Sequence, residues 1–441
     1  MATEEFSLPR SRAANERLHE LVPGGAHTYA KGDDQYPQDL APVISRGHGA
    51  HVWDVDGNRY IEYGSGLRSV SLGHAHPRVT EAVRRQLDRG GNFVRPSVVE
   101  IEAAERFLAT VPTAQMVKFA KNGSDATTAA VRLARAATGR QRVAVCADQP
   151  FFSVDDWFIG TTPMPAGVPP VTGDLTVTFP YGDLAAAAEL LGSLGDEIAC
   201  LVLEPATHTE PPPGYLAGLR ALADRHGCVL VFDEMITGFR WSEAGAQGLY
   251  GVVPDLSTFG KALGNGFAVS ALAGRRELME RGGLRHRGER VFLLSTTHGA
   301  ETHALAAAMA VQAVYAEEGV TARLHALGDR LAAGVREAAS GMGVGDHVLV
   351  RGRSSNLVFV TLDERGQPSQ PYRTLFLRRL LAGGVLAPSF VVSSALSEDD
   401  VDRTVAVVAE ACAVYRKALD AGDPAPWTGG RAVRPVFRRR A

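Results

Sequence analysis

Amphipathic helical segments alternate with short, wholly apolar runs over much of the chain. From about residue 77, helical periodicity appears in VTEAVRRQLDR, VVEIEAAERFLATV and ATTAAVRLARAAT. The apolar runs are MVKFA, RVAVCA, IACLVLEP, CVLVFDE and LSTFG. Continuous apolar strands between helices are typical of a parallel sheet that is buried on both faces. We therefore predict an α/β fold with a mostly parallel central sheet.

The regions on either side of this pattern have a different character. HVWDVDGNRYIEY alternates apolar and polar residues around a DG turn, which predicts a β-hairpin after a polar N-terminal helix. The last third combines long helices with the strand-like HVLVRGRSSNLVFVTL, which predicts a smaller α+β domain. We predict that residues 1–75 join this small domain, that 76–315 form the large domain and that 316–425 form the rest of the small domain. Residues 426–441, rich in Gly, Pro and Arg, are expected to form a loose basic tail.

The composition of the chain argues against nucleic acid and membranes as binding partners. The 441 residues carry a net charge of −3 and are 45% hydrophobic, so the chain lacks the excess of positive charge that binding to nucleic acid or to an anionic membrane requires. No apolar window approaches the roughly 18–20 residues of a membrane span, and the start shows no signal peptide, so we expect a cytoplasmic protein. The four cysteines are widely spaced without a CxxC pair, and no metal site is predicted. A small-molecule ligand is favoured.

Carboxylates stand at the ends of two predicted strands, where ligands bind in open α/β sheets. CVLVFDE carries Asp233, and ACLVLEP carries Glu204. A strand-end carboxylate also occurs in enzymes that hydrolyse nucleotides, but these need a GxxxxGK[ST] loop. The Gly-Lys pair at Lys261 has Asp255 in place of the first glycine and Ala262 after the lysine, which argues against that interpretation.

Lys261 directly follows the run LSTFG and lies among glycines, although the chain contains only five lysines. A lysine at the mouth of a sheet, near the strand-end Asp233, fits an amine that forms a Schiff base with a carbonyl cofactor. The carboxylate would then hold a pyridinium N–H, and this pair is what pyridoxal 5′-phosphate requires. An ordinary surface lysine is the alternative.

Two further segments have both a functional and a structural interpretation. Gly123 and Ser124 stand between a strand and a helix, and such a helix start can bind a phosphate group. Ordinary helix capping is the alternative. Phe151 follows the next strand, where it can either stack on a planar ring or join the core.

Together, the motifs resemble the class-III aminotransferases of pyridoxal-phosphate fold type I. The motifs occur in the order NGSDA, an aromatic residue, LEP, FDEMITGFR, FGKALGNG and STTHG, and they follow the block VWDVDGNRYIEYGSGLRSVSLGHAHP. The resemblance spans nearly the whole chain. It implies a large cofactor-binding domain with a seven-stranded type of sheet, a smaller α+β domain and pyridoxal phosphate as cofactor.

The resemblance also implies roles for individual residues. Lys261 would form the Schiff base with the cofactor, and Asp233 would pair with the pyridine nitrogen. Gly123 and Ser124 would bind the phosphate, and Glu204 would lie near the cofactor hydroxyl.

Three more residues match positions around the cofactor ring or its phosphate. Phe151 corresponds to the stacking aromatic, and Ile236 would pack on the opposite face of the ring. Thr297 corresponds to a phosphate ligand that this family supplies from the neighbouring subunit. A homodimer with two shared active sites follows from this resemblance.

Within the class, the chain is most similar to glutamate-1-semialdehyde aminomutase. In LVPGGAHTYAK, Thr28 and Lys31 occupy positions that contact substrate in that family, and a solvated loop lysine is the alternative at Lys31. The chain departs from its pattern in FFS, where Tyr-His-Gly is usual, and in THGAET, where Thr-Leu-Ser-Gly-Asn-Pro is usual. These variants resemble a side branch found with enzymes of amino-sugar and aminocyclitol synthesis. We therefore expect amino transfer, with L-glutamate as donor, to the ketone or aldehyde of a sugar-like or cyclitol acceptor, phosphorylated or not.

Arg68 and Arg95 lie in loops that approach the cofactor in this fold, and either can pair with a substrate carboxylate or phosphate. A structural arginine is the alternative at both positions. For the protein as a whole, three other interpretations remain open: the aminomutase itself, another pyridoxal-phosphate reaction such as racemisation or decarboxylation, and a cofactor-sensing regulator. An external amino donor distinguishes a transaminase, which consumes one, from a mutase, which needs none.

Overall fold

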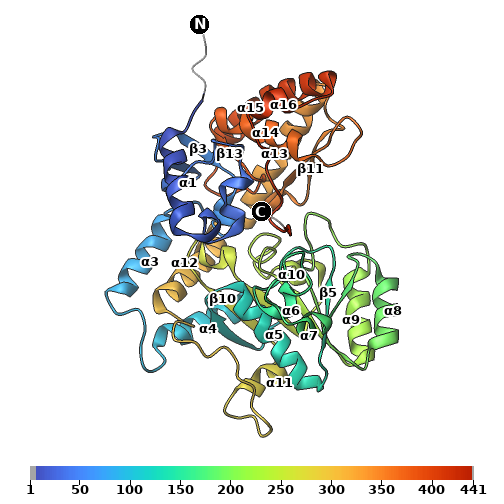
Figure 1. Ribbon diagram of the computed structural model, residues 1–441. Helices are drawn as coiled ribbons and strands as arrows, with labels where there is room; N and C mark the ends of the chain where they lie inside the picture. The colour runs from blue at the N-terminus through green and yellow to red at the C-terminus, as the bar shows by residue number, and fades with distance from the viewer. Residues whose placement is uncertain (1–5, 440–441) are drawn as a thin grey trace. The chain divides into compact units, whose positions relative to one another are not determined.

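The structure is a computed structural model that describes residues 6–439 and divides into two compact units (Figure 1). The first unit comprises residues 6–66, 71–76 and 322–439, and the second comprises Leu67–Val70 and Pro77–Thr321. The sequence places the boundaries at 75/76 and at 315/316. The second boundary lies at 321/322 in the structure, because α12 (Thr302–Glu318) belongs to the second unit. The second unit also includes Leu67–Val70, which the sequence assigned to the small domain.

In the described part of the chain, the second unit is built on a seven-stranded sheet of order β4-β10-β9-β8-β7-β5-β6 (Figure 1). The strands are β4 (Met116–Ala120), β5 (Arg142–Cys146), β6 (Thr176–Phe179), β7 (Ile198–Leu203), β8 (Val229–Asp233), β9 (Leu256–Phe259) and β10 (Ser270–Gly274). β10 runs antiparallel to β4 and β9, and the other pairs are parallel. The mostly parallel sheet expected from the sequence is confirmed.

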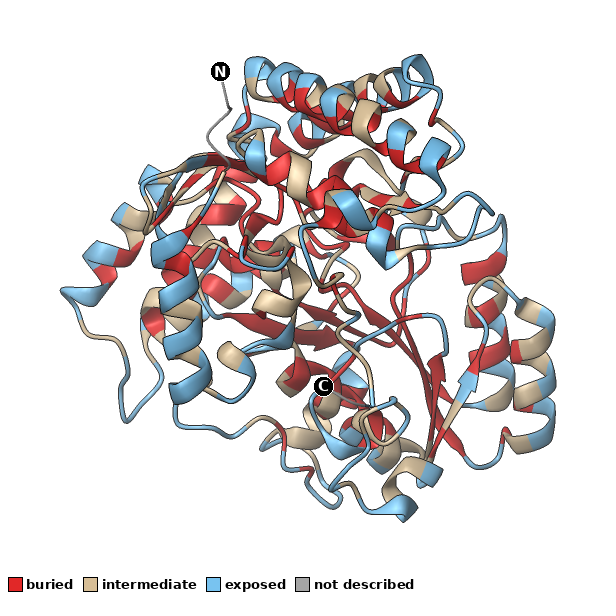
Figure 2. Cartoon of the chain, turned by 45° about the horizontal axis from the view of Figure 1, so that its top comes forward, coloured by how far each residue is buried: buried red, intermediate tan, exposed pale blue. Residues whose placement is uncertain are grey.

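Helices cover both faces of this sheet. They are α5 (Gly123–Thr138) on one face and α8 (Leu184–Leu194) and α9 (Tyr215–His226) on the other. Alternate strand residues face the two layers: Val143 and Val202 pack with α5, whereas Ala144 and Leu201 pack with α8 and α9. Every residue of β7 and β8 is buried, and the strands of the central sheet are largely red in Figure 2. The strand ends therefore emerge from a closely packed core, which holds them in place.

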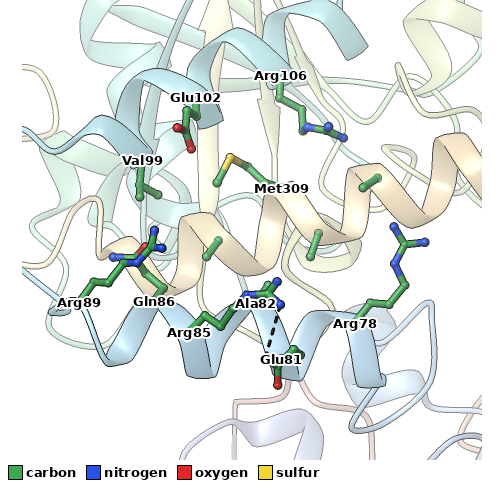
Figure 3. Close-up of a pocket in the computed structure, with 13 residues that line it drawn as sticks. Arg78, Glu81, Ala82, Arg85, Gln86, Arg89, Val99, Glu102, Arg106 and Met309 are labelled. Carbon is green, nitrogen blue, oxygen red and sulfur yellow. Dashed lines mark hydrogen bonds and ion pairs between the residues drawn. The ribbon is translucent and has the colours of Figure 1, made fainter.

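Three longer helices of the described second unit pack together and border a groove of about 550 Å³ (Figure 3). They are α3 (Pro77–Leu87), α4 (Val98–Thr110) and α12. Ala306 and Met309 of α12 contribute to its apolar lining, Arg85 reaches it from α3, and Arg89 reaches it from the turn after that helix. The groove shares no lining residue with the predicted cofactor site.

Short helical turns connect the strands of the second unit. They are α6 (Asp156–Ile159), α7 (Pro170–Asp174), α10 (Ala246–Tyr250), η4 (Lys261–Gly264), α11 (Arg276–Met279) and η5 (Glu280–Gly282). Two of them, α10 and η4, follow the ends of β8 and β9 and border the candidate site.

The first unit contains, within its described residues, a four-stranded sheet of order β1-β2-β3-β13. Its strands are β1 (Ile44–His48), β2 (His51–Asp54), β3 (Arg59–Glu62) and β13 (Val385–Leu386), and a separate pair is formed by β11 (Val348–Arg351) and β12 (Val358–Thr361). The helices are α1 (Pro9–Leu21), α13 (Val320–Gly341), α14 (Gln370–Ala382), α15 (Glu398–Ala421) and α16 (Ala425–Thr428). β2 and β3 form the predicted hairpin, whose turn is closed by Asn58 N–H donating to Asp54 Oδ1 at 2.8 Å.

The C-terminal segment differs from the loose tail expected for 426–441. Val433 is buried, and its N–H donates to Thr374 Oγ1 at 2.9 Å. The N–H of Arg434 donates to Asp34 O at 3.0 Å, and Arg438 pairs with the Asp34 carboxylate at 2.5 Å. Composition suggested looseness, but these contacts to distant parts of the chain order the segment. Residues 440 and 441 of the predicted tail lie outside the described residues.

Among residues 6–439, no helix combines the length and apolar character that crossing a lipid bilayer requires.

Candidate active site

The predicted cofactor residues follow the carboxyl ends of neighbouring strands. β4, β5, β7, β8 and β9 run in one direction, so these ends share one edge of the sheet. Gly123 and Ser124 follow β4, Phe151 follows β5, Glu204 follows β7, Asp233 ends β8 and Lys261 follows β9. A Cβ atom added at Gly123 or at Gly260 would lie 3.1 or 2.6 Å from Met235 Sδ. The loops after β4 and β9 therefore meet at Met235, which places the start of α5 beside Lys261.

Asp233 is oriented through one of its two carboxylate oxygens. The backbone N–H of Met235 donates to Oδ1 at 3.0 Å, and Thr258 Oγ1 donates to the same oxygen at 3.2 Å. Within residues 6–439, Oδ2 accepts no hydrogen bond. Burial raises the pKa of Asp233, and Lys261 and the two hydrogen bonds oppose that effect. The carboxylate is thus fixed in direction, with one oxygen able to accept from a ring N–H.

Lys261 is a partly buried residue with a strained backbone. Its φ is +46°, a left-handed conformation that is unfavourable for residues other than glycine. Burial lowers the pKa of its amine, whereas the charges of Asp233 and Glu204 raise it. In the described part of the chain, Nζ forms no hydrogen bond or ion pair. A desolvated amine without a partner is suited to act as a neutral nucleophile and base.

Glu204 is held through its backbone, which leaves its carboxyl group available. Gln149 Nε2 donates to Glu204 O, and the N–H of Glu204 donates to Gln149 Oε1, both at 2.7 Å. Burial, followed by the charge of Asp233, raises the pKa of Glu204 to about 7, while Lys261 and Arg68 lower it. None of the residues 6–439 forms an ion pair with its carboxylate. Near neutral pH this carboxyl group can therefore either donate or accept a hydrogen bond.

The start of α5 presents unpaired backbone amides. Asn122 is the cap: its Oδ1 accepts from Asp125 N–H at 3.1 Å. In the described structure the amides of Gly123 and Ser124 donate to no protein group, and Ser124 Oγ accepts from Val154 N–H at 3.0 Å. Capping alone therefore leaves two amides at the start of this 16-residue helix available to bind an anion.

The two residues expected to face the cofactor ring are both accessible. Phe151 is 44% exposed and meets the edge of Phe158, with ring centroids 5.9 Å apart. From Cys228 to Trp241, all of which are described, Ile236 is the one residue that is not fully buried. Accessible apolar surface at both positions suits a flat ring between them.

Thr297 is exposed on the loop before α12. Asn92 Nδ2 donates to its carbonyl oxygen at 3.0 Å. Four residues later in the chain, Glu301 forms an ion pair with Lys121 and accepts a hydrogen bond from His298 Nδ1 at 2.9 Å. The loop is thus anchored at both ends while the Thr297 residue itself stays open to solvent.

The predicted substrate contacts fall in different parts of the chain. Thr28 and Lys31 belong to the first unit, and Arg68 and Arg95 to the second. Arg95 is exposed and makes no hydrogen bond or ion pair with residues 6–439. Arg68 ends α2 (Ser65–Arg68), a single turn in which all four residues have positive φ. Of the two arginines, Arg68 is the one that the structure connects to the strand-end residues, through its effect on Glu204 and Lys261.

Three residues outside the predicted set support the site: Gln149, Met235 and Arg240. Arg240 is fully buried, and its Nη2 donates to Arg68 O at 3.0 Å. Met235 and Arg240 lie within the motif DEMITGFR, so a sequence signal marked the segment but not their contacts. Arg240 is 172 positions from Arg68 and Gln149 is 55 from Glu204, distances at which periodicity carries no information.

The atoms at this edge fit a cofactor that carries a pyridine ring, a phosphate and a carbonyl group. Asp233 Oδ2 can accept from the ring N–H, the amides of Gly123 and Ser124 can bind the phosphate, and Lys261 can react with the carbonyl. In the described residues no group of three or more His, Cys, Asp or Glu side chains is arranged to hold a metal ion.

A family model described as aminotransferase class-III matches residues 32–390. Because the match covers well over half of the sequence, the chain belongs to the class-III aminotransferase family.

Curated relatives of the chain carry the name glutamate-1-semialdehyde 2,1-aminomutase. The protein from Chloroflexus aurantiacus is 40% identical over 293 residues, which are 64% of this chain and 65% of that relative. The match thus spans slightly less than two thirds of its length. The protein from Chloroflexus aggregans is 34% identical over 442 aligned positions, covering 94% of this chain and 99% of that one.

A similar solved structure is an omega-transaminase from Sphaerobacter thermophilus. It is 28% identical, has a TM-score of 0.82, and the match covers 93% of this chain and 98% of that one. The fold type I architecture implied by the motifs is thereby confirmed.

Proposed function

We propose that this protein is an aminotransferase that takes an amino group from L-glutamate and transfers it to a ketone or aldehyde carbon of a sugar-like or cyclitol intermediate, phosphorylated or not. The observation that carries the proposal is the pair at the ends of β8 and β9. There, Asp233 has an oriented carboxylate with an available Oδ2, and Lys261 is partly buried and has an amine without a partner in the described residues. The cofactor is pyridoxal 5′-phosphate, as in the class-III family, and the strand-end residues fit it.

When bound, pyridoxal phosphate supplies a ring that withdraws electrons from the substrate carbon. Asp233 keeps the ring nitrogen protonated by accepting its N–H, which strengthens that withdrawal. Burial lowers the pKa of Lys261, which favours the neutral form of its Nζ, and a neutral amine there could take a proton from the substrate carbon. The same amine could later give the proton back, so one group would serve both transfers.

The surrounding residues hold the reacting groups in place. The amides of Gly123 and Ser124 would bind the phosphate at the start of α5. Phe151 and Ile236 would pack against the ring and exclude water there. Glu204 would bond to the cofactor hydroxyl, and its pKa of about 7 would let it donate or accept as that hydroxyl requires.

The substrate class rests on departures from the aminomutase pattern. The chain has Phe151-Phe152-Ser153 and Thr297–Thr302 where that family has a different lining. Phe152 and Ser153 are buried, and Phe152 O accepts from Thr127 Oγ1 at 2.7 Å, so these two residues belong to the core beside α5. Phe151 and His298, which also differ from the aminomutase pattern, are exposed, and they support a substrate other than glutamate 1-semialdehyde.

Glutamate-1-semialdehyde aminomutase activity is the second candidate. It is favoured by the curated relatives of that name, one of which aligns over 94% of this chain. A mutase moves the amino group within one molecule and needs no external donor. Consumption of L-glutamate therefore separates the two functions.

We further propose a cytoplasmic homodimer in which Thr297 binds the phosphate in the partner's site. Thr297 is exposed, as a residue that serves another subunit must be. Apolar side chains around α4 support a second copy as the covering partner: Phe93 is 50%, Val94 101%, Val98 67% and Ile101 58% exposed.

A visible spectrum of the purified protein with and without L-glutamate tests the function. We expect a band at about 410–430 nm that moves to about 330 nm with glutamate. Lys261→Ala should lose the first band, and Lys417→Ala, at an exposed lysine, should keep it. A bound cofactor that ignores L-glutamate and other amino donors would favour the aminomutase. The absence of a cofactor band in the native protein would contradict the roles of Lys261 and Asp233.

A further inference from the structure

The turn α2 has an unusual backbone for its sequence, Ser-Gly-Leu-Arg. Its φ angles are +45° at Ser65, +54° at Gly66, +58° at Leu67 and +72° at Arg68. Three of these residues are not glycine, and left-handed backbone is unfavourable for each of them. Such conformations persist where tertiary contacts impose them, and they concentrate at ligand sites.

Contacts within the second unit fix the end of this turn at the strand-end edge. Arg240, on the loop after β8, donates from Nη2 to Arg68 O at 3.0 Å and is itself fully buried. Val70 lies against the loop after β9, because its Cγ2 is 3.5 Å from the Cβ position of Gly266. The segment Leu67–Val70 is therefore held between the loop that follows Asp233 and the loop that carries Lys261.

Arg68 is a partly buried cation whose charge acts on the reacting groups. Burial lowers its pKa, and Glu204 is the acid that opposes this effect. In turn, the charge of Arg68 lowers the pKa of both Glu204 and Lys261. Arg68 thus acts on the charge of both groups that would lie next to a bound substrate.

We propose that Arg68 is the specificity residue that binds an anionic group, a carboxylate or a phosphate, on the substrate of this site. The proposal rests on the function proposed above and adds the charge of the substrate to it. A guanidinium matches both anions with two parallel N–H···O bonds, which a lysine cannot reproduce. The clamped, strained turn pre-organises this group, so that little order has to be created on binding.

Paired amines test the proposal in the holoenzyme. The carboxylate pair is 4-aminobutanoate and butylamine, and the phosphate pair is O-phosphoethanolamine and ethanolamine. The apparent Kd of each is measured from the loss of the band at about 410–430 nm. Arg68→Gln should raise the Kd of one anionic amine at least about 10-fold, equivalent to about 1.4 kcal/mol, and change that of its neutral partner less than about 2-fold. The pair that responds identifies the anion.

Two further variants define the result. Arg68→Lys keeps the charge without the paired donors and should fall between wild type and Arg68→Gln. Arg89→Gln removes one arginine charge at the groove of Figure 3 and should leave all four Kd values unchanged. If Arg68→Gln weakens the neutral and anionic amines equally, or neither, the proposal is wrong.

A binding measurement keeps this test independent of amino transfer. Calorimetric titration of the holoenzyme with succinate and with inorganic phosphate should show one of them binding, and Arg68→Gln should abolish it. Unchanged binding in the variant, or no binding of either anion to wild type, would overturn the role of Arg68. A holoenzyme that binds the anion through Arg68 but reacts with no amine would contradict the proposed function and leave the anion site standing.

Discussion

Asp233 shows how one available atom can decide the chemistry of the site. Asparagine has the same shape, and its Oδ1 can still accept from Met235 N–H and Thr258. Its NH2 group, however, cannot accept from a ring N–H. We expect Asp233→Asn to slow the reaction with L-glutamate about 100-fold or more in stopped-flow absorbance. Thr258→Val, which removes only one bond to Oδ1, should cost less than about 10-fold. Equal losses in both variants would argue against a direct contact to the ring.

Glu204 makes stability depend on pH. Burial raises its pKa from 4.5 to about 7, so the folded protein binds a proton that the unfolded chain releases at lower pH. The stabilisation from this group is complete below pH 4.5 and is lost as the pH rises through 7. Relative to wild type, Glu204→Gln should therefore gain about 1–3 kcal/mol in unfolding free energy between pH 5 and pH 8. Urea unfolding at both pH values measures this gain, and Glu189→Gln, at an exposed glutamate, should show none.

At the scale of elements, Glu234 fixes how the chain continues after β8. Its carboxylate accepts from the N–H groups of Ala246 and Gln247 at 2.7 and 2.8 Å, at the start of α10, and from Thr237 Oγ1. Glu234→Ala would leave buried amides unpaired and should lower the unfolding free energy by about 2–4 kcal/mol in urea. Glu277→Ala, on the exposed side of α11, should change it by less than about 0.5 kcal/mol. A loss no larger than in this control would show that α10 needs no cap.

Elements with a uniform apolar run could be predicted from sequence, and others could not. β7 and β8 are buried at every residue, so both faces require apolar side chains and the pattern is unambiguous. β10 reads Ser-Ala-Leu-Ala-Gly, and its extended conformation comes from pairing with β4 and β9. The left-handed conformation of α2 could not be predicted from sequence either, because the hydrogen bond from Arg240 that helps to stabilise it comes from 172 positions away.

At the scale of the whole molecule, the sequence could place together those candidate residues that the topology of the sheet brings to one edge. A parallel sheet brings the ends of its strands to one edge, so Asp233 and Lys261 could be placed there from their positions alone. The two hydrogen bonds between Gln149 and the backbone of Glu204 join two separate loops, so no local sequence pattern could predict them. The C-terminal segment is the opposite case: its composition predicted looseness, but burial of Val433 beside Thr374 orders it.

The proposed sharing of sites can be tested with mixed dimers. If Thr297 serves the partner's site, a dimer of one Lys261→Ala subunit and one Thr297→Ala subunit contains one intact site and one doubly altered site. We expect such dimers, isolated with two affinity tags, to have about half of the wild-type activity and one site of wild-type affinity for pyridoxal phosphate. The Thr297→Ala homodimer should bind the cofactor about 10-fold more weakly, since a hydrogen bond to a charged group is lost.

The alternative makes the opposite prediction. If Thr297 bound the phosphate of its own subunit, each site of the mixed dimer would carry one substitution. The Lys261→Ala site would be inactive, and the other would bind the cofactor as weakly as the Thr297→Ala homodimer. The cofactor affinity of the single active site therefore distinguishes the two arrangements. The exposure of Thr297 favours the shared one, and the bond from Asn92 to its backbone leaves its hydroxyl available in either arrangement.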